Sequence, residues 1–433
     1  MDNRNYDAMV VGGGIAGLQA ASDLADQGYK VLIVEKEPSV GGKMILLAKV
    51  FPTLDCASCI TTPKMSYAKN HENITILTLS QVTSVERQGN DFKVQVHREP
   101  RYVNEETCTG CRKCEQACPV LRPDPFDYDL GITKAIHLPF NNAIPLKAVL
   151  DMDHCIQCGA CARACPVPDC INYLDQGEEY EFTVKTVIKS TGFDMTPMGA
   201  KKEYHANELT NVISPMQMER LIAPHGPYGG VLRPTDGKLP DSIAYVQCAG
   251  SRDETLGVPY CSRVCCMYAI KQAMLLSGIL PLADITIYYM DIRTFGKGYE
   301  EFYQSAKSMG IEFVKGKVAQ ITEADNDNVK LRVEQIGENG GLKEVEHDLC
   351  VLSLGMVPTK LENDPFGLEL GADKFICSRN PKLSSTLTSE EGVFAAGTAV
   401  GPKDIVDSIV EASAAAMQAS VYLQNLPKLE LNQ

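Results

Sequence analysis

Apolar runs alternate with helical patterns at the start of the chain, as in a parallel α/β fold. The apolar run at residues 8–11 predicts a short strand, and an amphipathic stretch that ends at Asp26 predicts a helix after it. A second apolar run, at residues 31–34, predicts the next buried strand. Because two strands joined by a helix make a βαβ unit, we expect a doubly wound sheet of mainly parallel strands.

A segment of different composition interrupts this pattern. At about Arg101 the sequence becomes rich in cysteine, proline and charged residues, and the change reverses near Glu179. Strand patterns resume at residues 183–188, before a connection rich in proline and glycine at about residues 224–240. The segment between the two composition changes is therefore predicted to be an insertion into the first domain.

A second α/β unit follows this connection. Residues 243–246 and 285–289 predict strands, and residues 267–276 predict a helix between them. From Leu349 the chain is expected to return to the first domain, and an alanine-rich helix is predicted at about residues 405–423. These patterns divide the chain into a Rossmann-type first domain at residues 1–98, 181–240 and 346–433, an insertion at residues 99–180, and a second α/β domain at residues 241–345.

Charge and composition narrow the classes of function. The 433-residue chain has a net charge of −14, which argues against a nucleic acid or an anionic membrane as its general partner. No apolar run approaches the roughly 18 to 20 residues of a membrane span, and the N-terminus lacks a signal-peptide pattern. Most of the 17 cysteines fall into clusters with the spacing of metal ligands, which favours a reducing compartment. We therefore expect a cytoplasmic protein in an anaerobic setting.

The glycine-rich turn after the first strand fits a bound dinucleotide. Gly12, Gly14 and Gly17 supply the tight turn, the close approach of the backbone to a pyrophosphate and the close packing of helix on strand. Glu35 ends the next strand, about 20 residues further on, where a ribose needs a hydrogen-bond acceptor. A glycine-rich turn without a ligand is the alternative interpretation.

Motifs beyond this turn favour FAD over NAD. Residues 35–42, an acidic residue followed by two glycines, resemble a motif of flavoproteins with two dinucleotide-binding domains. Residues 190–192 and 392–397 resemble later motifs of that superfamily. Many of its members have an aspartate after the last glycine, where this chain has Thr398, so this contact stays open. The residues expected to bind FAD are Gly12, Gly14, Ala16, Gly17, Glu35, Lys36, Gly42, Thr191, Gly192, Gly397 and Thr398.

The strongest local signal is a repeated cysteine motif. Each copy has the form CxxCxxCxxxCP, and a [4Fe–4S] cluster needs four converging thiolates. In the two-cluster ferredoxin pattern, three cysteines of one copy share a cluster with the fourth cysteine of the other. Zinc, the alternative, normally takes its ligands as two pairs. We expect one cluster on Cys108, Cys111, Cys114 and Cys165, and another on Cys155, Cys158, Cys161 and Cys118.

The second α/β unit carries four more cysteines. Cys248 follows a predicted strand, where the crevice of an α/β sheet opens, and Cys261, Cys265 and Cys266 come soon after it. We interpret them as ligands of a third cluster, with packed thiols as the alternative. Because Cys248 stands where a nicotinamide-binding GxGxxG turn would lie, we expect no direct reaction with NADH or NADPH.

The remaining cysteines give weaker signals. Cys56 and Cys59 form a CxxC motif that is compatible with a redox pair, a partial metal site or buried thiols, and the sequence does not choose among them. Cys170, Cys350 and Cys377 are expected to be structural or incidental.

The chain resembles the A-type subunit of heterodisulfide reductase, the FAD-bearing core of flavin-based electron-bifurcating complexes. The resemblance implies a thioredoxin-reductase-like fold with a repurposed second dinucleotide domain, and it supports the third cluster. Longer members of this family carry an extra N-terminal domain and a C-terminal ferredoxin domain, so a short form without them is expected. The matching stretches are the two cysteine motifs and residues 51–59, 248–253, 260–271, 289–302 and 401–405.

The resemblance also implies a role inside a complex. A flavin exchanges two electrons and each cluster carries one, so this set of cofactors describes a branching point between electron routes. Lys271 and Lys403 are expected to be cations near the isoalloxazine ring, with surface lysines as the alternative. Expected partners are B- and C-type subunits, a hydrogenase, formate dehydrogenase or flavin oxidoreductase module, ferredoxin, and a second copy of the chain. Two alternatives stay open: a relay subunit of a quinone-interacting or acyl-CoA-reductase complex, and a scaffold without flavin chemistry.

Overall fold

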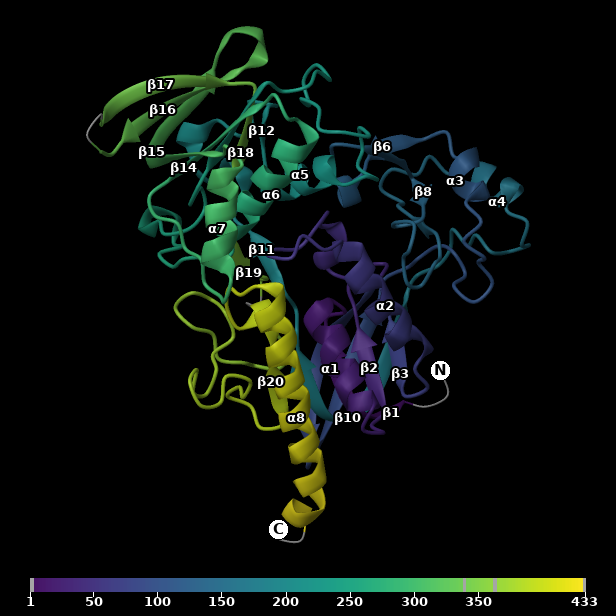
Figure 1. Cartoon of the computed structure of the whole chain (residues 1–433). Helices are drawn as coiled ribbons and strands as arrows, with labels where there is room; N and C mark the ends of the chain where they lie inside the picture. Colours follow the sequence, from purple (N-terminus) through teal and green to yellow (C-terminus); the bar gives the residue numbers. More distant parts are fainter. Residues whose placement is uncertain (1–3, 338–339, 361–363, 431–433) are drawn as a thin grey trace.

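The computed structural model describes residues 4–337, 340–360 and 364–430, which build two large sheets (Figure 1). The first sheet has the order β3–β2–β1–β10–β5–β4, with β20 beside the end of β10. β1, β2, β3 and β20 run parallel to β10, whereas β5 pairs with β10 in the antiparallel sense. The strands are β1 Asn5–Val11, β2 Val31–Val34, β3 Ile74–Leu77, β4 Ser80–Gln88, β5 Asp91–Arg98, β10 Glu178–Lys189 and β20 Val393–Ala395.

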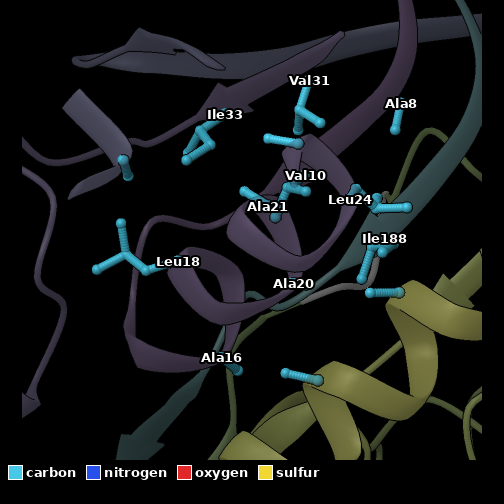
Figure 2. Packing of buried hydrophobic residues seen from close by; sticks show 14 of the residues in the cluster. Ala8, Val10, Ala16, Leu18, Ala20, Ala21, Leu24, Val31, Ile33 and Ile188 are labelled. Carbon is cyan, nitrogen blue, oxygen red and sulfur yellow. The ribbon is translucent and has the colours of Figure 1, made fainter. Parts of the chain in front are cut away.

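Helices α1 (Ile15–Ala25) and α8 (Ile405–Glu430) share one apolar core with the first sheet. Figure 2 shows α1 packed against the sheet, with α8 beside it, around small side chains such as Ala20 and Ala21. The alanines of α8 allow this close packing, because four of them are fully buried in the same core. Helix α2 (Ala57–Asn70) adds Met65 and Ala68. The turn before α1 is thereby held on a rigid support.

The cysteine-rich segment lies between two neighbouring strands of the first sheet. Arg98 at the end of β5 is paired with Glu178 at the start of β10, so the chain leaves and re-enters the sheet at one place. Residues 99–177 form a lobe beside the main body, seen in blue in Figure 1. Its elements are short: α3 Lys113–Ala117, α4 Ala160–Ala164, β6 Leu121–Pro123, β7 Ile132–Lys134, β8 Ile136–His137 and β9 Val149–Leu150.

The second sheet has the order β12–β18–β13–β14–β15–β16–β17. Its first five strands are parallel, and β16 and β17 extend it as antiparallel strands. Apolar side chains of α5, α6 and α7 form a core on one of its faces. The elements are β12 Val212–Ile213, β13 Ser242–Val246, β14 Asp284–Tyr289, β15 Glu312–Glu323, β16 Val329–Gln335, β17 Gly341–His347, β18 Leu349–Leu352, α5 Pro215–Ile222, α6 Cys265–Ile279 and α7 Tyr299–Ser308.

Two of the predicted boundaries of the second domain are wrong. β12 lies before residue 241, and β18 lies after residue 345, yet both belong to the second sheet. β18 pairs with β13 and β12, so the chain does not return to the first domain at Leu349. The physical reason is that a short, fully buried parallel strand is a continuous apolar run in the sequence, and such a run does not indicate which of the two sheets the strand joins.

A small ribbon connects the two halves of the molecule. β11 (Phe193–Met195) leaves the first sheet and pairs with β19 (Met356–Pro358), which returns from the second. Among the described residues, no helix has the length and apolar character needed to cross a membrane.

Candidate functional site

The glycine turn between β1 and α1 is shaped by very close contacts. A Cβ atom on Gly12 would lie 2.3 Å from the carbonyl oxygen of Ser190, and one on Gly17 would lie 1.8 Å from that of Gly12. Packing alone therefore requires glycine at both positions. Gly14, the N-cap of α1, differs, because a Cβ there would meet only the Cα atom of Gly42, at 3.9 Å. The space above Gly14 and the free N–H groups of α1 fit a phosphate group.

The carboxylate of Glu35 is buried beside this turn. One oxygen accepts a hydrogen bond from the N–H of Gly13 at 2.6 Å, and the other accepts one from the N–H of Glu37 at 2.9 Å. Burial raises the pKa of Glu35, and the two backbone donors oppose this effect. Each oxygen retains a lone pair, so the side chain is placed to accept hydrogen bonds from a ribose.

The later motifs converge on the first turn of α1. A Cβ atom on Gly42 would lie 2.8 Å from the Cα atom of Gly14, and one on Gly397 would lie 2.9 Å from the Cβ atom of Ala16. Thr398 follows Gly397 in a 3-10 turn, Gly397–Ala399, just before α8. Lys36, by contrast, is exposed, and its Nζ atom lies 3.9 Å from the Oε1 atom of Glu37.

One polar side chain of the predicted set has no partner. The hydroxyl of Thr191 is buried and makes no hydrogen bond in the described part of the chain. Thr191 directly follows Ser190, the residue in contact with the glycine turn, and it precedes Gly192, whose φ of +80° suits glycine. A buried hydroxyl without a partner is destabilising unless a ligand satisfies it. The unpartnered hydroxyl of Thr191 and the glycine turn between β1 and α1 together fit a bound dinucleotide.

Both predicted cationic residues form ion pairs; Lys271 is buried and Lys403 is half-buried. The Nζ atom of Lys271 in α6 donates to the carbonyl oxygen of Lys49 at 2.8 Å and to Glu219 at 2.5 Å. The Nζ atom of Lys403 donates to Glu411 at 2.5 Å, and the same carboxylate oxygen accepts the N–H of Gly397. Each lysine is therefore balanced by a carboxylate, and Lys403 lies directly beside the turn that ends the dinucleotide motif.

Glu219 is a site residue that the sequence reasoning missed. Besides Lys271, it accepts hydrogen bonds from the N–H of Ala48 at 3.0 Å and from the side chain of Gln272 at 2.5 Å. It thus ties the segment after Gly42 to α5 and α6. The capping box formed by Ser214 and Gln217 marks the start of α5, but no local signal indicates partners this distant in sequence.

Four of the repeated cysteines line one pocket in the insertion. They are Cys108, Cys111, Cys114 and Cys165, the set expected for the first cluster. Cys165 is the C-cap of α4, and the others come from the first motif: Cys108 and Cys111 from the segment that leads into α3, and Cys114 from α3 itself. Among the described residues, no three His, Cys, Asp or Glu side chains are arranged to hold a single metal ion. A [4Fe–4S] cluster needs four converging thiolates, so the lining of this pocket fits one.

Three of the other four repeated cysteines, Cys118, Cys155 and Cys161, belong to the apolar core of the insertion, whereas Cys158 is exposed. Cys155, Cys158 and Cys161 lie around Tyr173, whose hydroxyl is 2.9 Å from the Sγ atom of Cys161. Burial, and then the contact with Cys161, raises the pKa of this tyrosine. Cys118 is the C-cap of α3, and α3 packs against α4.

The cysteines of the second domain are also brought together. Burial raises the pKa of Cys266 to about 12, and the neighbouring thiols of Cys248 and Cys261 add to the rise. The pKa of Cys265 is raised by burial and by the other three thiols. Cys248 has a φ of +57°, a strained conformation for a residue other than glycine. Arg263, next to these thiols, pairs with Asp407 of α8 at 3.1 Å.

The CxxC motif lies at the start of α2, at the edge of the first domain. Cys56 is the N-cap, and its Sγ atom accepts a hydrogen bond from the N–H of Cys59 at 3.2 Å. Cys59 is exposed. Cys350, in β18, is fully buried as a small apolar side chain, and Cys377 is half-buried. Cys170, expected to be structural or incidental, lies in the pocket of the first cluster.

Two family models match the chain. The model of an NAD(P)-binding Rossmann-like domain matches residues 10–45, around the glycine turn. The model of a 4Fe-4S binding domain matches residues 101–121 and 148–168, the two copies of the cysteine motif. The insertion therefore carries sites for [4Fe–4S] clusters.

Solved structures of similar fold cover nearly the whole chain. The thioredoxin reductase of T. acidophilum has a TM-score of 0.53 at 16% identity, covering 97% of this chain and 98% of its own. The thioredoxin reductase of Lactococcus lactis has a TM-score of 0.54 at 15% identity, covering 97% of this chain and all of its own. The predicted thioredoxin-reductase-like α/β fold is confirmed.

Curated relatives share much higher identity. The A-type subunit of the H2:CoB-CoM heterodisulfide,ferredoxin reductase of Methanothermobacter marburgensis is 44% identical over 419 residues, 96% of this chain and 63% of the relative. The A-type iron–sulfur subunit of the CoB–CoM heterodisulfide reductase of Methanocaldococcus jannaschii is 46% identical over 422 residues, 95% of this chain and 64% of the relative. The chain spans less than two thirds of the length of these relatives. It belongs, as its motifs predicted, to the family of heterodisulfide reductase A-type subunits.

Proposed function

We propose that the chain is an oxidoreductase: the FAD- and iron–sulfur-containing electron-transfer subunit of a heterodisulfide-reductase-like complex. The observation that carries this proposal is the link between the second-domain cysteines and the dinucleotide site. Arg263, between Cys261 and Cys265, pairs with Asp407 in the first turn of α8, and the turn before α8 contacts α1 through Gly397. This link supports a short route between a flavin and a third cluster.

The residues of the first domain would bind and orient FAD. The N-terminus of α1 at Gly14 would offer N–H groups to the pyrophosphate, and Glu35 would accept hydrogen bonds from the ribose. The buried hydroxyl of Thr191, which has no partner among the described residues, would form a hydrogen bond with the cofactor. Lys403 and Glu411 lie beside the Gly397 turn, and their ion pair would place one positive and one negative charge next to the bound cofactor. When bound, FAD supplies the exchange between a two-electron couple and one-electron carriers.

The thiolates of the chain would hold the one-electron carriers. Two clusters bind in the insertion, and the third binds to Cys248, Cys261, Cys265 and Cys266. Arg252 lies beside Cys248 and shares the carboxylate of Asp291 with Arg293, so the edge of the third site carries a net positive charge. A fixed cation raises the potential of a nearby cluster by stabilising its reduced, more negative form.

The names of the relatives support a role for the chain in a complex of several subunits. One relative is named for H2, a heterodisulfide and ferredoxin together, so its name joins several redox couples. We extend this to the present chain as the flavin-based bifurcation or confurcation point, working with B- and C-type subunits and a hydrogenase, formate dehydrogenase or flavin oxidoreductase module in the cytoplasm. A second copy of the chain within the complex completes the proposal.

The test measures which donor reduces the flavin of the anaerobically purified chain. Reduced ferredoxin is expected to bleach the flavin absorbance, because electrons enter through clusters. NADH and NADPH are expected to leave it unchanged, because residues 247–264 between β13 and α6 hold cysteines in place of a glycine turn for pyrophosphate. Stoichiometric bleaching by either nucleotide, or no bleaching by ferredoxin, contradicts the proposal.

A further inference from the structure

A fifth cysteine lines the pocket of the first cluster. Cys170 shares this pocket with the four expected ligands, and its sulfur interacts with that of Cys165. Cys170 is almost fully buried, and besides its interactions with the side chains of Cys165 and Thr107, its Sγ atom lies 4.0 Å from the carbonyl oxygen of Asn104. The pocket thus holds one more thiol than a cubane requires.

The internal repeat makes this fifth thiol informative. The two cysteine motifs are offset by one constant interval, so the residue of the first copy that corresponds to Cys170 is Pro123. The second cluster therefore has no equivalent thiol from the repeat. Because only one of the two duplicated copies has a thiol at this position, Cys170 is expected to have a role at the first cluster that has no counterpart at the second.

The backbone around Cys170 is well anchored. Its carbonyl oxygen accepts the N–H of Asn104 at 2.7 Å, and the next residue, Ile171, forms a β-bridge with Val103 on the pocket wall. Cys165, by contrast, lies at the C-terminal end of the five-residue helix α4 and is half-buried. The anchored thiol can therefore stay in place while the end of α4 moves.

We propose that Cys170 is a reserve ligand of the first cluster, able to replace Cys165 as its fourth thiolate. This rests on the cluster assignment proposed above. In the exchange, the Fe–S bond to Cys165 breaks and an Fe–S bond to Cys170 forms. The proton of the Cys170 thiol passes to the released Cys165 sulfur, so neither net charge nor electron count changes. The first cluster then survives loss of the one ligand that it takes from the second motif.

The experiment compares variants of the full chain after anaerobic purification. Iron content and the electron paramagnetic resonance spectrum of the reduced clusters are measured for wild type, Cys165→Ala, Cys170→Ala and the double variant. Cys118→Ala is the matched control, because it removes the corresponding ligand of the second cluster, where Pro123 replaces the reserve thiol. Each intact cubane contributes about four irons.

Cys165→Ala is expected to keep the iron content of wild type with an altered spectrum, and Cys170→Ala is expected to keep both iron and spectrum nearly unchanged. The double variant and Cys118→Ala are expected to lose iron or to show a three-iron cluster. If Cys165→Ala loses as much iron as Cys118→Ala, or if the double variant keeps its iron, the proposal is overturned. Wild type with fewer than about eight irons would instead overturn the two-cluster assignment itself.

Discussion

Replacing Gly14 by alanine is expected to remove FAD while leaving the fold intact. The added Cβ atom meets only the Cα atom of Gly42, at 3.9 Å, and the backbone of Gly14, with φ −75° and ψ −173°, suits any residue. We therefore expect the free energy of unfolding to change by no more than about 1 kcal/mol. The methyl group instead fills the space through which a pyrophosphate must approach the N–H groups of α1.

The size of the effect follows from the bonds that the methyl group prevents. Hydrogen bonds to a charged group are each worth about 1.5 to 3 kcal/mol, so the loss of one or two of them weakens binding by a factor on the order of 10 to 10,000. The assay is fluorescence titration of the flavin-free protein with FAD, together with thermal unfolding. Gly278→Ala is the control, because Gly278 is an exposed position near the end of α6 with no atom within 4 Å of the added Cβ. A folded Gly14→Ala protein with wild-type FAD affinity would refute the assignment.

Three further substitutions test other parts of the structure. Cys265→Ala should remove about four of the irons, with the ferredoxin-type clusters unchanged in their spectrum, and an unchanged iron count would mean that the second-domain cysteines are packed thiols. Lys271→Met should destabilise the fold by about 3 to 5 kcal/mol in chemical unfolding, because Glu219 stays buried without its cation, whereas exposed Lys36→Met should change stability by under about 0.5 kcal/mol. Tyr173→Phe should lower the potential of the second cluster in a redox titration by roughly 40 mV, the equivalent of one hydrogen bond of about 1 kcal/mol, and an unchanged potential would count against that bond.

Features with a local physical cause could be predicted from the sequence. Gly17 is set by its contact with Gly12 inside one turn, so the spacing of the two glycines indicates the dinucleotide motif, although Gly12 itself is also required by the distant Ser190. The repeated cysteines are similarly close in sequence, and four of them line one pocket as expected. The strands at residues 243–246 and 285–289 lie within β13 and β14 because buried parallel strands are continuous apolar runs.

Features that depend on distant partners could not be predicted. The ion pair between Glu219 and Lys271 joins two helices, and no sequence motif indicates that these two residues are partners. Cys170 lies outside the CxxCxxCxxxCP pattern, and only the folded insertion brings it to the pocket of the first cluster. β12 is two residues long, so no periodicity could assign it to the second sheet.

The central claim is that one chain holds a flavin and three iron–sulfur clusters. Its most direct test is the iron and flavin content per chain after anaerobic purification with acid-labile sulfide measured in parallel. The proposal predicts one FAD and about twelve irons, four for each cubane. About eight irons with one FAD would remove the third cluster, and a chain that carries its clusters but no FAD would contradict the proposed electron-transfer function and leave a scaffold.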